Sequence, residues 1–456
     1  MESQHTSRLG IEPVGCLMAK LAFPSIIAQL INVLYNMVDR IYLGHIPDIG
    51  KEALTGVGVA FPIIMIIAAF SAFTGRGGAP LAAIAMGKGD KTRAELFLGN
   101  SITYLLIISI LLTVGFSIFK VPVLYAFGAS DQTIGHATTY IGIYLIGTVF
   151  VQLSLGLNNF ISAQGFAKTA MWSILIGAIA NIILDPIFIF LFDLKVAGAA
   201  IATIISQALS AVWIFYFLLS KKSTIRIRFP RMRIQYPIVA KILSLGISPF
   251  VMYATESAII IVFNFGLQRY GGDLYVGAMT IMNSVMQLMV VPLQGFTQGI
   301  QPIISYNYGA RKFDRVKKTV LITVIVAFLF SSMGWLLSSI FPRIFASWFT
   351  TDMQLIGLVE KALPIFVGGM WLFGIQIACQ TAFLGLGQSR ISLFIALLRK
   401  VILLIPLALI LPRFFGVMGI FWAEPVSDII SASTSGLVFL FSYKKILTEK
   451  VLDRIA

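Results

Sequence analysis

Two stretches far apart in the chain, GRGGAPLAAIAMGKGDKTRAE at 75–95 and TQGIQPIISYNYGARKFDRVK at 297–317, align residue for residue. Their shared positions keep one offset of 222 residues, and the same offset recurs well downstream of both stretches. A register sustained over that distance indicates an internal duplication, because chance produces only isolated matches. The matching pairs are Pro80 with Pro302, Gly87 with Gly309, and Gly165 with Gly387.

The composition around this repeat predicts a membrane protein. The 456 residues are 58% hydrophobic and 12% charged, with a mean hydropathy of +0.91, which is too apolar for a water-soluble core. A helix needs about 20 apolar residues to cross a hydrocarbon layer of about 30 Å. Twelve such runs are predicted, at 17–43, 54–85, 94–119, 133–160, 169–192, 196–219, 241–267, 276–306, 318–341, 356–385, 391–411 and 417–443.

Each copy of the repeat holds six spans, so both copies enter the membrane from the same side. Two such copies are related by an axis along the membrane normal. We therefore predict an all-α membrane protein of twelve transmembrane helices in two homologous six-helix lobes, related by a pseudo-two-fold axis. The predicted divisions are an N-lobe at 1–220, a basic linker at 221–240 and a C-lobe at 241–456.

The net charge of +15 reflects topology rather than nucleic-acid binding, because basic residues crowd particular connections between spans. The linker, the second-to-third connection, the eighth-to-ninth connection and the C-terminus carry most of them. By the positive-inside rule, both termini and the linker are cytoplasmic. The first apolar run is long enough to span and remain, and Cys16 and Cys379 indicate neither a metal site nor a disulfide.

Acidic residues inside the first and fifth spans form the main candidate site. Gln29, Asn32, Asn36 and Asp39 follow helical spacing along one face of the first span, and Asn181 and Asp185 share a face of the fifth. Both aspartates lie in the outer halves of their helices, so they can meet. Two carboxyl groups with amide oxygens in a low dielectric suit a proton or Na⁺. The alternative is that Asp39 pairs with Arg40 and that Asp185 caps the turn before Pro186.

The second half carries its own intramembrane charges. Glu256 lies on the seventh span, Glu424 and Asp428 share a face of the twelfth, and Arg399 lies at a similar depth on the eleventh. An embedded charge is costly, so each needs a partner or a function. The four residues could form a second ion site, or a self-neutralising structural network.

Two further patterns bear on transport. Met279, Met282 and Met286, with Asn283 and Gln287, follow the eighth span and predict either core packing or an adaptable substrate wall. Pro24 and Pro249 fall at comparable points of the first and seventh spans, where each removes a backbone hydrogen bond. Paired bends at equivalent positions indicate hinges.

Several segments together resemble the multidrug and toxic compound extrusion (MATE) family, over nearly the whole chain and most closely its bacterial MepA-like and DinF-like branch. The segments are LAFPS leading into YNMVDRIYLG, AMGKGD, AQGFAK, NIILDPIFIF and PLQGFTQGIQPIISYNYGA. The resemblance implies two lobes around a central cavity, and drug export driven by inward H⁺ or Na⁺ flow without ATP.

Residue by residue, the resemblance implies that Asp39 with Asn181 and Asp185 forms the N-lobe cation site and that Pro24 is the first-helix bend. It also implies that Glu256 is the seventh-helix acid that other branches use. The acid those branches carry on the tenth span has no counterpart in GIQIACQTAFLGLGQ. This departure argues against a complete C-lobe sodium site.

The function expected is therefore a multidrug efflux antiporter, working by rocker-type alternating access in the bacterial cytoplasmic membrane. Its partners would be hydrophobic cationic drugs and membrane lipid, with no nucleic acid, no cofactor beyond H⁺ or Na⁺, and a monomeric state. The alternative is a flippase for lipid-linked oligosaccharides, which would want cavity-facing bases; the candidates are Arg76, Arg399 and Lys400. No HExxH or GxSxG motif points to an enzyme.

Overall fold

The structure is a computed structural model that describes residues 4–448 and 451–452. Within those residues it is helical throughout its ordered elements and contains no strand. The helices are α1 (Gln4–Ile11), α2 (Val14–Gly44), α3 (Gly50–Gly87), α4 (Lys91–Ala126), α5 (Ile134–Ile146), α6 (Thr148–Ala163), α7 (Ala167–Pro186), η1 (Ile187–Leu191), α8 (Lys195–Leu219), η2 (Phe229–Met232), α9 (Tyr236–Gly271), α10 (Asp273–Gly309), α11 (Phe313–Ile340), α12 (Pro342–Ser347), α13 (Met353–Phe366), α14 (Met370–Gly385), α15 (Ser389–Leu397), η3 (Leu398–Leu404), α16 (Ile405–Ile410), α17 (Pro412–Phe415) and α18 (Met418–Ile446).

The predicted membrane fold is confirmed. In the described part of the chain, 10 helices are long and apolar enough to cross a membrane, and two bent helix pairs raise the number to 12. The predicted spans 133–160 and 356–385 are these pairs, bent by 61° between α5 and α6 and by 51° between α13 and α14. Glycine, a poor helix former, lies at both breaks. Gly147 and Gly369 are also 222 residues apart, so the break belongs to the repeat.

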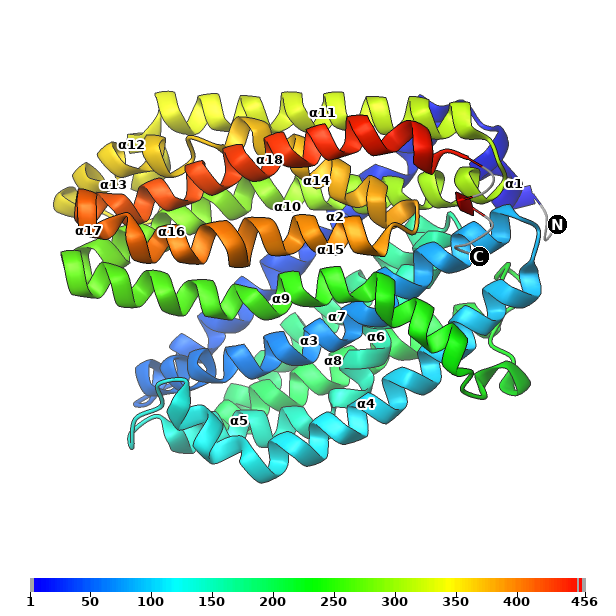
Figure 1. Cartoon of the computed structure of the whole chain (residues 1–456). Coiled ribbons are helices and arrows are strands. Elements are labelled where there is room, and N and C mark those ends of the chain that lie inside the picture. Colours follow the sequence, from blue (N-terminus) through cyan, green and yellow to red (C-terminus); the bar gives the residue numbers. More distant parts are fainter. Residues whose placement is uncertain (1–3, 449–450, 453–456) are drawn as a thin grey trace.

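The two lobes lie one above the other in Figure 1, with α3–α8 below and α10–α18 above, and α2 runs from the upper group to the lower one. They cross where α3 meets α10. A side chain at Gly87 would meet the carbonyl oxygen of Tyr306, and one at Gly309 would meet that of Ile84. Because Ile84 and Tyr306 are themselves 222 residues apart, the two contacts are reciprocal, as a two-fold axis between the repeats requires.

Other contacts between the lobes lie toward the same end. The ring of Phe73 stacks on that of Phe250 with 4.4 Å between centroids, and Arg76 donates to the hydroxyl of Tyr253 at 2.9 Å. This is also the end that carries α1 and the linker (Figure 1). The lobes are therefore joined at the linker end of the molecule.

The linker is held to the N-lobe. The Glu95 carboxylate, 1% exposed, forms ion pairs with Arg228 and Arg231, and the side-chain oxygen of Gln164 accepts from the backbone of Thr224 and Ile225. Buried charges and amides of this kind need partners, and the linker supplies them. The linker is thus packed on the N-lobe as part of its surface.

Candidate functional site

The predicted aspartate pair forms between α2 and α7. The carboxyl group of Asp39 lies within hydrogen-bonding reach of that of Asp185, and Asn181 donates to Asp185 Oδ1 at 3.2 Å. Asp185 is 0% exposed and Asn181 2%. The helical spacing of four residues on α7 therefore places both side chains toward α2, as the sequence pattern predicts.

Three oxygens at this point have no donor in the described part of the chain. Oδ1 of Asp39, Oδ2 of Asp185 and Oδ1 of Asn181 are shielded from solvent and make no hydrogen bond. Leaving a buried acceptor unmatched costs about 1–3 kcal/mol, and more for a charged group. A proton shared by the carboxyl groups, or a cation bound between the oxygens, would remove that cost.

Tyrosines surround the pair, and the sequence pattern does not single them out. Tyr35 and Tyr140 interact electrostatically with Asp39. Tyr140 is 3% exposed and its ring stacks on Tyr144. The rings bring surface of low dielectric close to the carboxyl groups, which strengthens electrostatic interactions between them.

The alternative for Asp39, an ion pair with Arg40, is not formed in the described residues. Arg40 lies over the ring of Phe61, 5.3 Å from its centroid, and no ion pair joins it to Asp39 within residues 4–448. Asn36 stays apart from the pair: its side chain is exposed and its amide donates to the carbonyl of Asn32 at 2.6 Å. Its place among the ion ligands therefore stays a prediction.

The C-lobe charges form a bonded network. Arg399 donates from Nε to Asp428 at 2.7 Å and from Nη2 to Glu424 at 2.8 Å. Its guanidinium also lies 4.4 Å from the ring centroid of Phe373. Both carboxylates are thus matched by a cation, which is the arrangement of a self-neutralising network.

Lys400 is the partner that the sequence pattern did not assign to Glu256. Its ammonium forms an ion pair with Glu256 and donates to the carbonyl of Met252 at 3.0 Å. Arg399 and Lys400 are consecutive residues of η3, a π-helical turn. Such turns shift the direction of successive side chains and are frequent at functional sites. Here the turn sends one cation toward α18 and the other toward α9.

The methionine stripe is buried in the C-lobe core, as the core-packing alternative predicts. Met279 and Met282 are 2% and 0% exposed and belong, with Met286 at the edge, to the apolar core of the C-lobe. The helix α10 packs against several others, so its stripe faces the lobe interior. Asn283 is half-buried and Gln287 is exposed, so of this set Gln287 is the most accessible.

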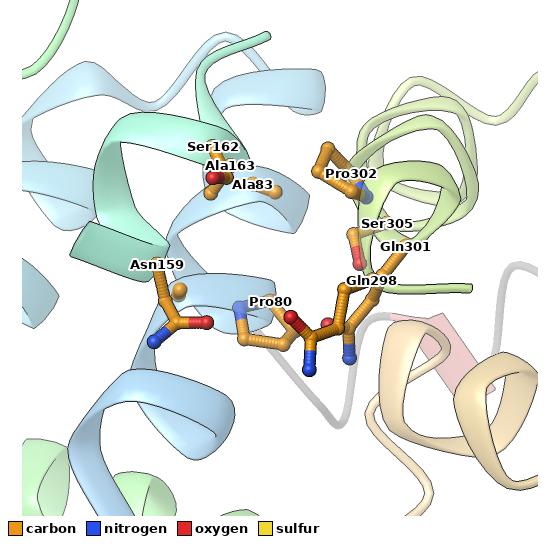
Figure 2. A pocket seen from close by; sticks show the side chains of 10 residues that line it. Pro80, Ala83, Asn159, Ser162, Ala163, Gln298, Gln301, Pro302 and Ser305 are labelled. Carbon is orange, nitrogen blue, oxygen red and sulfur yellow. The ribbon is translucent and has the colours of Figure 1, made fainter. Parts of the chain in front are cut away.

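A small pocket lies between the lobes at the linker end. Figure 2 shows that Pro80 of α3 and Pro302 of α10, partners in the repeat, lie on opposite walls, with Asn159 and Gln298 facing the space. Near it, Gln29 donates to Gln298 across the two lobes at 2.8 Å. Gln29 of the predicted polar face therefore joins the lobes and does not belong to the aspartate site.

The comparison with known proteins agrees with this geometry. A sequence profile of the MatE family matches residues 24–187 and again residues 249–410, more than half of the chain. The chain belongs to the MatE family. The two MatE matches begin at Pro24 and Pro249, so each predicted bend lies at the start of one copy of the duplicated unit.

Named MatE relatives cover almost the whole chain. It is 24% identical over 440 residues to the multidrug export protein MepA of Staphylococcus saprophyticus, covering 95% of each. It is 25% identical to MepA of Staphylococcus aureus, covering 93% of each. Among solved structures, the MATE multidrug transporter DinF-BH, determined as a ligand complex, matches with a TM-score of 0.90 and 33% identity over 98% of this chain and 99% of that one.

The two MatE prolines lie in different surroundings. Pro24 is buried within α2, the helix that carries Asp39. Pro249 lies within α9, where the neighbouring Ser248 is bonded to Gln380. Their roles as hinges stay predictions, and the structure shows that the C-lobe bend is tied to its own lobe.

Proposed function

We propose that this protein exports drugs, organic cations above all, from the bacterial cytoplasm in exchange for H⁺ or Na⁺. The observation that carries the proposal is the aspartate pair of Asp39 and Asp185, two carboxyl groups in contact with no base bonded to them in the described chain. Such a site takes up a small cation. MepA relatives that are multidrug export proteins supply the substrate class.

The proposed mechanism is alternating access by rocking of the two lobes, and the place where the lobes are joined supports it. The reciprocal contact of Gly87 and Gly309 and the hydrogen bond of Gln29 with Gln298 lie at the linker end. Opening that end requires those contacts to separate. Basic residues at the same end support its assignment, with both termini, to the cytoplasmic side by the positive-inside rule. The protein would then act as a monomer in the inner membrane with its substrate path between the lobes.

The flippase alternative is less well supported. A pyrophosphate-bearing lipid would need bases that are open to the cavity, but each candidate base is already engaged. Arg76 donates to Tyr253, Arg399 is bound by two carboxylates, and Lys400 by Glu256. The surplus of embedded acids favours a cationic substrate.

The test is transport in proteoliposomes with the gradients imposed one at a time. Tetraphenylphosphonium, and a panel of other hydrophobic cations, should move against its gradient when a pH or a Na⁺ gradient is applied, and not when neither is present. Transport that is insensitive to both gradients would refute the coupling. Failure to move any cation, together with movement of a lipid-linked oligosaccharide, would favour the flippase.

A further inference from the structure

The two lobes treat their embedded acids differently. In the N-lobe, Asp39 and Asp185 face each other with unmatched oxygens and no bonded base in the described chain. In the C-lobe, Glu256, Glu424 and Asp428 are all bonded to Lys400 or Arg399. Side chains of the protein itself thus neutralise the carboxyl groups of one lobe and leave those of the other unpaired.

We propose that Lys400 is a built-in cation that occupies the C-lobe acid site and so prevents it from exchanging a coupling ion. The inference rests on the proposed function only in calling the exchangeable ion a coupling ion. That Lys400 occupies the acid site is a property of the folded chain and does not depend on what the protein transports. An exchangeable cation at Glu256 would have to displace the ammonium of Lys400, which is tethered to the same lobe and present at high effective concentration.

The geometry around Lys400 supports a permanent occupant. Its side chain is 9% exposed, whereas that of Glu256 is 53% exposed. The ammonium is therefore the buried member, and it has a second acceptor in the carbonyl of Met252 at 3.0 Å. A buried ammonium that lost Glu256 would be left charged in a low dielectric, which costs several kcal/mol. The ammonium of Lys400 accordingly stays in the site, while the carboxylate of Glu256 remains partly exposed.

Met252 connects this site to the bend of α9. It follows Pro249 by three residues, and on the other side of the proline Ser248 is bonded to Gln380 and Ser392. The C-lobe thus holds α9 on both sides of its proline. On α2, by contrast, the acid that follows Pro24 faces another acid. An ion from solution can therefore change the net charge of the acid site on α2. On α9, the bound ammonium of Lys400 keeps the net charge of the acid site constant.

The experiment uses the full-length protein in nanodiscs, with the N-lobe site silenced by Asp39→Asn and Asp185→Asn. Infrared difference spectra of the carboxyl groups are recorded on changing pH and on exchanging Na⁺ for an impermeant organic cation. With Lys400 present, the silenced protein should show no change at Glu256. Replacing it by Lys400→Met should add one cation site per chain, seen as a protonated carboxyl band or as a Na⁺-dependent carboxylate shift.

Two variants identify the group. Lys400→Met combined with Glu256→Gln should abolish the new signal, and Lys400→Arg, which keeps the charge, should leave the spectrum as in the silenced protein. No new signal in Lys400→Met would overturn the proposal, and so would a proton or Na⁺ signal at Glu256 while Lys400 is present. These spectra require no transport, so they are independent of whether drug export proves to be cation-coupled.

Should Lys400→Met fail to fold, Glu256→Gln in the otherwise unchanged chain decides the question. The number of ions exchanged per drug, from the reversal potential in proteoliposomes, should be unchanged because Glu256 binds no exchangeable ion. A lower number would overturn the proposal.

Discussion

Replacing Asp39 by asparagine should stabilise the protein while it abolishes gradient-driven export. Asn at this position keeps the size of the side chain and brings an amide donor beside the carboxyl group of Asp185, whose Oδ2 has no donor among the described residues. A hydrogen bond to a charged acceptor contributes about 1.5–3 kcal/mol. We therefore expect Asp39→Asn to raise the free energy of unfolding by about 1.5–3 kcal/mol.

The gain should depend on pH in a defined direction. As pH falls, a proton bound to the wild-type pair supplies the missing donor itself, so the difference between wild type and variant shrinks. Reversible unfolding in mixed micelles at several pH values measures this difference. Drug transport in proteoliposomes, with a drug-binding assay on the same preparation, separates loss of coupling from loss of binding.

Asn36→Ala is the matched control, because that side chain is exposed on the same helix and lies apart from the pair. It should change stability by no more than about 0.5 kcal/mol. If Asp39→Asn lowers the stability, the unmatched oxygens are not a source of strain in this state. Wild-type export by the variant under an imposed gradient would refute the coupling role of the pair and move attention to the acids of the C-lobe.

Three further changes test other parts of the mechanism. Pro24→Ala restores a backbone donor in a helix, where proline costs about 3 kcal/mol, so turnover should fall more than drug binding; normal turnover would make this proline a packing residue. Glu95→Gln weakens the ion pairs to Arg228 and Arg231. If the free energy of local unfolding of the linker falls by about 1.4 kcal/mol, tryptic cleavage of the linker should become about tenfold faster. Unchanged cleavage would show that the hydrogen bonds of the linker backbone are enough to hold it. Gly87→Ala places a methyl group against the backbone at the lobe crossing, so labelling of a cysteine engineered at the linker end should become faster. Unchanged labelling would mean that the helices adjust to the methyl group without separating the lobes.

Hydropathy and helical spacing predicted most of the fold and the N-lobe pair. Twelve spans follow from apolar runs of sufficient length, because the membrane leaves few alternatives. The spacing of Asn181 and Asp185 is enough to place both on one face of α7. The breaks at Gly147 and Gly369 were missed, since glycine is common within membrane helices and only the packing of neighbours decides which one bends.

The pairing of Glu256 with Lys400 could not be read from spacing. A regular helix would point Lys400 about 100° away from Arg399, but η3 is a π-helical turn and changes that register. The partners of Glu95 were missed for a different reason. Arg228 and Arg231 lie far along the sequence, and no local pattern tells which embedded or buried acid a linker arginine will meet. The methionine stripe alone could not decide between core packing and a substrate wall, and the burial of Met279 and Met282 on α10 agrees with packing.

The duplication explains why the two lobes share a backbone and differ in charge. At the crossing of Gly87 and Gly309, main chain meets main chain, so any side chain in either copy would force the helices apart. That constraint acts on both copies alike and keeps the glycines paired. The charged sites face no such constraint, because a carboxyl group is satisfied equally by an ion from solution or by a lysine from the next helix. One lobe can thus keep an exchangeable site while the other closes its own, and substitutions at the crossing should affect both lobes whereas charge substitutions should act on one.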